Sequence, residues 1–103
     1  MNDRKLLEQA AKAAGITWHG DGSDNSDMIV MMPFTRVWNP LENGGDALNL
    51  VVRLGLSIDT DRGESSVFEH DLDISCNEPH GSDADAATRR AIVRAAAEIG
   101  RNK

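Results

Sequence analysis

Apolar residues recur at helical spacing in three segments of the chain, and the first lies at the N-terminus. Between Asp3 and Ala14, Leu6 and Leu7 share a face with alanines one and two turns later, while charged side chains point away. Gly15 follows directly and is a residue type that commonly ends helices. This pattern predicts a helix over residues 3–14 that packs through one face.

The second and third segments differ in how much of their surface is apolar. The second is apolar around more than half of its circumference, with Asp46 placed to cap its start and Gly55 to end it. We therefore expect a central helix, packed on a sheet and on a further element. The third begins after Ser82 or Asp83 and ends at Gly100, and its small residues permit close approach to a neighbouring helix.

Shorter apolar stretches between these segments predict strands. Residues 28–32 form an unbroken apolar run closed by Pro33, which favours a strand covered on both faces over a short buried helix. Further strands are predicted at residues 16–18, 56–59 and 66–76, the last of them bent or broken, with a turn at residues 60–64.

The resulting order of elements is α-β-β-α-β-β-α. Because most connections are short, neighbouring strands are expected to pair antiparallel. The sequence therefore predicts an α+β fold with a mainly antiparallel sheet of about four strands. A length of 103 residues fits a single domain over residues 1–103.

Composition and charge narrow the classes of function. A net charge of −6 disfavours binding to the nucleic-acid backbone, and only four aromatic residues are present to stack on bases. The longest apolar run, residues 28–34, is too short to span a bilayer, and residues 2–5 are polar and charged where a secretory signal would be apolar. Cys76 is the single cysteine, so an internal disulfide is impossible. We expect a cytoplasmic protein with no membrane segment and no cofactor.

Four phrases of the sequence resemble the phage ABA sandwich domain family, which comprises small proteins of tailed phages and prophages. They are the Trp-Asn-Pro-Leu of residues 38–41, the Gly-Asp-Ala-Leu of residues 45–48, the Glu-Pro-His-Gly of residues 78–81 and the alanine-rich residues 86–95. The first predicted helix is also similar. The resemblance implies a sheet with helices on both faces and a phage or prophage origin. It brings no assigned activity and no catalytic residue.

Four residues are candidates for a binding site, because the loops before the second and third helices could converge at one end of a sheet. They are Trp38, Asn39, His80 and Arg89. Each has a structural interpretation as well. Trp38 could plug the sheet edge, Asn39 could bond to loop backbone and His80 could anchor its loop, while Arg89 is spaced to pair with Asp85 one turn earlier.

Other polar residues are better explained by structure. Arg90 and Arg94 are expected to project into solvent, and Cys76 to be a buried, inert thiol. His19, His70 and His80 lack metal-ligand spacing, and the aspartates of residues 21–27 do not match a calcium loop. We therefore predict no metal site and no nucleophile arrangement.

These observations lead to one main hypothesis and two alternatives. The main hypothesis is a non-enzymatic phage accessory protein of the host cytoplasm that binds a host or phage protein, or assembles with itself. The first alternative is a small-molecule binder or enzyme with a pocket formed by Trp38, Asn39, His80 and Arg89. The second, nucleic-acid binding, requires Arg90, Arg94 and Arg101 to form a stripe.

Overall fold

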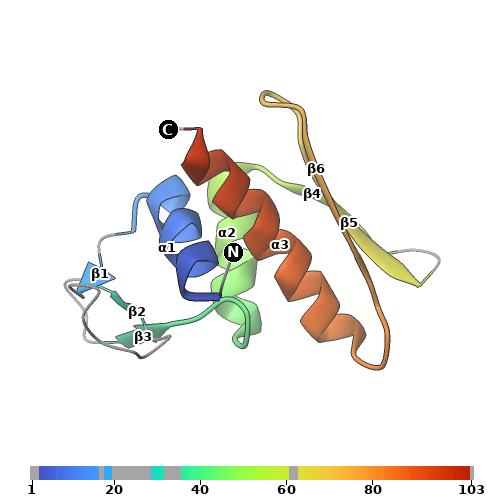
Figure 1. The fold of residues 1–103 in the computed structure, drawn as a ribbon, viewed down its shortest axis with the longest axis horizontal. Coiled ribbons are helices and arrows are strands. Elements are labelled where there is room, and N and C mark those ends of the chain that lie inside the picture. The colour runs from blue at the N-terminus through green and yellow to red at the C-terminus, as the bar shows by residue number, and fades with distance from the viewer. Residues whose placement is uncertain (1–2, 17, 20–28, 32–35, 61–62, 103) are drawn as a thin grey trace.

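A computed structural model describes residues 3–16, 18–19, 29–31, 36–60 and 63–102. In chain order the elements are α1 (Asp3–Ala14), β1 (Trp18–His19), β2 (Ile29–Met31), β3 (Arg36–Trp38), α2 (Gly44–Leu54), β4 (Ser57–Asp59), β5 (Glu64–Glu69), β6 (Ile74–Pro79) and α3 (Ala84–Arg101). The helices lie between the β1–β3 strands and the β4–β6 strands (Figure 1). The predicted α+β class is confirmed, and every strand pair in the described residues is antiparallel.

The number and grouping of the strands differ from the prediction. Instead of one sheet of about four strands, the described residues form two three-stranded sheets, in the orders β1-β2-β3 and β4-β5-β6. The additional strand in the first sheet is β3, which occupies a segment interpreted as loop. The additional strand in the second sheet arises because the stretch predicted at residues 66–76 is a hairpin. The structure therefore has one more strand than predicted before α2, and one more between α2 and α3.

The turn between β5 and β6 explains why the second of these strands was missed. The Glu69 carboxylate accepts hydrogen bonds from the backbone N–H groups of Asp71 and Leu72, and Asp73 adopts a left-handed φ of 57°. This local bonding reverses the chain. Phe68 consequently pairs with Ser75 and lies on the opposite face of the sheet from Cys76, which pairs with Val67.

One face of the β4–β6 sheet packs on α3, and no helix among the described residues covers the opposite face (Figure 1). Ser65, Val67 and Cys76 are buried on the α3 side. Asp59 and Asn77, on the other face, are exposed. The expectation of helices on both faces is therefore wrong for this sheet. Residues 29–31 do form a strand, but whether its two faces are covered lies outside what the structure describes.

The closest helix contact is the seam between α1 and α3, which lie side by side in Figure 1. Alanines from both helices are fully buried there. Gly100 lies so close to α1 that an added Cβ would overlap the backbone carbonyl of Gln9, with the carbonyl carbon at 2.9 Å. The predicted close approach is confirmed. The predicted helix end at Gly100 is wrong, because α3 continues to Arg101 and Asn102 caps it.

Helix α2 differs from the expected central helix in both its cap and its burial. Its N-cap is Asn43, whose side chain accepts from the Asp46 N–H at 2.9 Å, so Asp46 is not the cap. The helix ends at Gly55, which has a left-handed φ of 65°. Leu48 and Val52 are 61% and 73% exposed. Helix α2 therefore buries one narrow face and presents apolar side chains on another.

Candidate functional site

The loops that precede α2 and α3 meet in the structure, as the site hypothesis required. Together they line a hollow of about 390 Å³ at the α3 N-terminus. The first loop contributes Leu41 and Glu42, and the second contributes Pro79, His80, Ser82 and Asp83. Of the four candidate residues, His80 lines this hollow, whereas Trp38, Asn39 and Arg89 do not.

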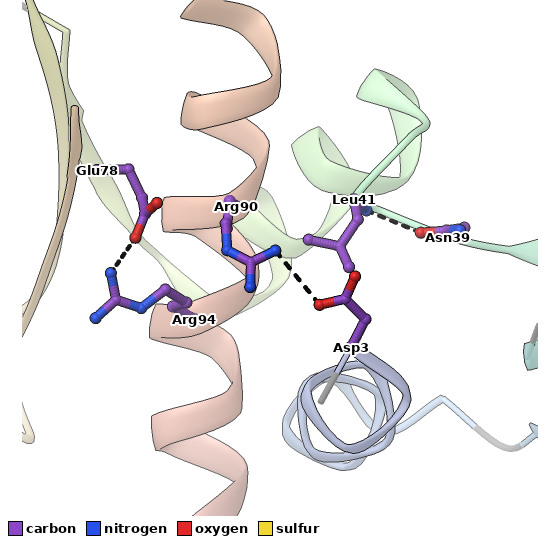
Figure 2. Close-up of polar contacts among 6 residues, drawn as sticks. All are labelled: Asp3, Asn39, Leu41, Glu78, Arg90 and Arg94. Carbon is purple, nitrogen blue, oxygen red and sulfur yellow. Dashed lines mark hydrogen bonds and ion pairs between the residues drawn. The ribbon is translucent and has the colours of Figure 1, made fainter. Parts of the chain in front are cut away.

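Trp38 and Asn39 hold the first loop in place. Trp38 is 1% exposed and belongs to the core. The Asn39 side-chain oxygen accepts from the Leu41 N–H at 3.0 Å (Figure 2), and the Asn39 N–H donates to the Asp46 carboxylate at 2.9 Å. Asp46 is itself buried, and this bond gives its carboxylate a partner. Trp38 therefore packs in the core, while Asn39 and Asp46 hold the backbone of the loop, so all three have structural roles.

His80 belongs to a chain of hydrogen bonds that crosses the interior beneath the second loop. Its Nε2 lies 2.9 Å from the Ser65 hydroxyl, which lies 2.6 Å from the Thr88 hydroxyl. Thr88 donates its single proton to the Ala84 carbonyl at 2.8 Å. With the Thr88 proton on the Ala84 carbonyl, Ser65 donates to Thr88 and accepts from His80. Every donor in the chain therefore points the same way.

This direction decides what the Ser65–His80 pair can do. A histidine that activates a serine must accept the hydroxyl proton, whereas in this arrangement Nε2 donates and the Ser65 proton is directed at Thr88. Ser65 is also fully buried. The pair therefore joins β5 to the second loop and to α3. The sequence did not indicate roles for Ser65 and Thr88. The inward position of Ser65 depends on the register of β5, which the sequence pattern did not predict.

Three arginines of α3 are paired with carboxylates. Arg90 reaches Asp3 of α1 at 3.4 Å, Arg94 contacts Glu78 of β6, and Arg101 contacts Glu98 at 2.6 Å. Figure 2 shows Arg90 and Arg94 reaching from α3 toward α1 and β6 respectively. Arg90 and Arg94 do project into solvent, as expected, with side chains 42% and 41% exposed, but each also forms an ion pair. The charges needed for a nucleic-acid stripe are balanced by neighbouring acids.

Arg89 behaves differently from these three. Its Nε donates to the Leu41 carbonyl at 2.9 Å, which fixes the side chain against the first loop. Among the residues that the structure describes, Arg89 forms no ion pair, and the expected pairing with Asp85 is absent. The rest of its guanidinium is therefore available to a ligand or partner.

Arg89 lines a groove of about 440 Å³ between α2, α3 and β4. Two stripes at helical spacing form its sides, one on α2 and one on α3, and β4 with the residue after it completes the lining. The residues are Gly44, Ala47, Leu48, Val51, Ile58, Thr60, Asp85, Thr88, Arg89 and Ile92. We call this surface the α2–α3 groove. It was missed from the sequence because α2 was expected to be covered.

The remaining polar candidates have structural explanations. Cys76 is buried, and burial raises the pKa of its thiol, which keeps it protonated and unreactive at neutral pH. The described residues contain no group of three or more His, Cys, Asp or Glu side chains placed to hold a metal ion. Within the same residues, no helix is long and apolar enough to cross a bilayer.

Searches of protein-family models, curated proteins and solved structures find no match to this chain. The geometry of the described residues therefore carries the functional argument.

Proposed function

We propose that this chain is a non-enzymatic accessory protein that binds a protein partner through the α2–α3 groove and the apolar side of α2 beside it. The resemblance to the phage ABA sandwich domain family is the reason to place it in a phage or prophage, acting in the host cytoplasm. The observation that carries the binding role is the exposure of Leu48 and Val52, at 61% and 73%.

These two side chains lie one turn apart on α2, and Leu48 also lines the groove. We call them the α2 ridge. A pocket for a small molecule typically encloses its ligand. Here the apolar surface extends beyond the groove to Val52, which is not among the groove residues. An apolar strip beside an open groove is typical of a surface that another polypeptide covers.

The small-molecule alternative receives less support. Its four residues are divided between the core, the first loop, the hollow at His80 and the α2–α3 groove. Asn39 and Arg89 are linked indirectly through Leu41. The Leu41 N–H donates to the Asn39 side chain, and the Leu41 carbonyl accepts from Arg89. That bridge uses the polar atoms that a ligand would otherwise contact.

The test uses a photo-crosslinking amino acid placed at residue 52 or residue 72 in cells that produce the protein. Leu72 is a matched control, because it is also apolar and 49% exposed but lies in the β5–β6 turn. We expect protein adducts from position 52 and few from position 72. Equal yields at both positions, or adducts from neither, would show that the α2 ridge is not a binding surface.

A further inference from the structure

The α2 ridge and the α2–α3 groove lie side by side, so one surface carries both a raised and a hollow apolar feature. Leu48 belongs to both, and Val52 lies one turn further along α2. Ala47, Val51 and Ile58 supply apolar lining inside the groove. A surface with a ridge next to a matching groove can fit a copy of itself turned through 180° about an axis between them.

The charges of the groove can also match those of a second copy turned through 180°. Asp85 and Arg89 both line it, four residues apart on α3, and they are not paired with each other. Asp85 is exposed and holds no ion pair within the described part of the chain. Arg89 keeps its guanidinium charge without a carboxylate, unlike Arg90, Arg94 and Arg101. The groove therefore presents one anion and one cation.

We propose that the partner in the groove is a second copy of this chain, related by a two-fold axis. The α2 ridge of each copy fills the groove of the other, and Asp85 of each copy faces Arg89 of the other. An interface of this kind requires a self-complementary surface, which the two unpaired charges of opposite sign provide. This inference rests on the proposed function and names the partner.

The net charge of −6 on each copy opposes the association. This repulsion acts between exposed charges and is largely screened beyond about 8 Å at physiological ionic strength. Ion pairs at the contact are screened less, so the ridge and the Asp85–Arg89 pairs determine the outcome. We expect a dimer with a dissociation constant of about 1–100 μM.

The test mixes two charge-reversal variants. Asp85→Arg makes both groove charges positive, and Arg89→Glu makes both negative, so each variant alone places like charges across the two-fold axis. We expect each to dimerise at least about tenfold more weakly than the wild-type chain. An equimolar mixture restores two opposite pairs and should form a 1:1 heterodimer, detected by sedimentation velocity and native mass spectrometry.

Arg89→Glu also loses the bond to the Leu41 carbonyl, so circular dichroism must confirm its fold. Leu48→Asp gives an independent test, because its exposed side chain is not needed for folding: it should be monomeric while Leu72→Asp dimerises like the wild-type chain. A wild-type chain that stays monomeric to about 1 mM would overturn the proposed dimer. So would a mixture with no heterodimer. If position 52 still crosslinks to another protein, the proposed function survives that result.

Discussion

The α1–α3 seam and the α2 ridge are both apolar helix surfaces, but the chain covers the first and leaves the second open. At the seam, buried alanines and Gly100 bring the backbones of α1 and α3 into direct contact. On α2, Leu48 and Val52 remain exposed although Leu50 between them is fully buried. The comparison separates apolar surface that stabilises this fold from apolar surface that is available to a partner.

The largest effect is expected from breaking the seam at Gly100. Gly100→Ala places a Cβ against the backbone carbonyl of Gln9, which cannot move without shifting α1. Overpacking costs about 1–3 kcal/mol, and we expect the upper end here because the neighbour is backbone. Chemical denaturation should show this loss. A variant within about 0.5 kcal/mol of the wild-type free energy of unfolding would mean that the seam is looser than described.

A smaller loss is expected where the sheet meets α3. Thr88→Val keeps the shape of the side chain but leaves the buried Ser65 hydroxyl without its acceptor, at a cost of about 1–3 kcal/mol in unfolding free energy. Ser65→Ala alone removes the shared partner of His80 Nε2 and of the Thr88 hydroxyl, which keeps its bond to the Ala84 carbonyl. Because the double variant removes both hydroxyls, it should cost less than the sum of the two single variants. Additive losses would contradict the hydrogen-bond chain.

On the α2 ridge, Val52→Asp should change the free energy of unfolding by less than about 0.5 kcal/mol, because the side chain is already in water. It should nevertheless abolish association through the groove. Leu50→Asp, two residues earlier on the buried face, should prevent folding, since it places an unpaired charge in the core. If Val52→Asp were also unfolded, the α2 ridge would be part of the packed core and not a surface available to a partner.

The smallest effect concerns the Cys76 thiol on the sheet face that packs on α3. Burial raises its pKa in the folded chain, so the unfolded chain loses that proton first as the pH rises. The contribution of the protonated thiol to stability is therefore constant at neutral pH and declines above about pH 8.5, the ordinary pKa of cysteine. Unfolding free energies of the wild-type chain and Cys76→Ala should diverge in slope above that pH. Parallel curves would contradict the burial of the thiol.

Local patterns predicted much of the fold. The bounds of α1 and the end of α2 at Gly55 follow from apolar spacing and from residue types that cap helices. The sequence narrowed the cap of α3 to Ser82 or Asp83, and the structure shows Asp83. The small residues of α3 correctly indicated close helix packing. The α+β class and the antiparallel pairing follow from the short connections. Each of these features depends on residues near one another in the sequence.

What could not be predicted depends on contacts between distant segments. Asp46 fits the cap position of α2, yet Asn43 takes that role and Asp46 bonds to the Asn39 backbone. The breadth of the apolar face of α2 indicated burial on two sides, but Leu48 and Val52 are exposed on one of them. The sequence suggested a pocket of Trp38, Asn39, His80 and Arg89 between converging loops, but of these four only His80 lines the hollow. The α2–α3 groove was not predicted, because it exists where α2 is left uncovered.

The most direct test of the account follows backbone amide chemical shifts of the isotopically labelled chain while it is diluted. The α2–α3 groove and the α2 ridge should shift with concentration, including Leu48, Val52, Ile58 and Arg89. Amides of the α1–α3 seam and of the β5–β6 turn should stay constant. Shifts confined to the turn, or an unchanged spectrum up to about 1 mM, would contradict the claim that α2 carries the interaction surface.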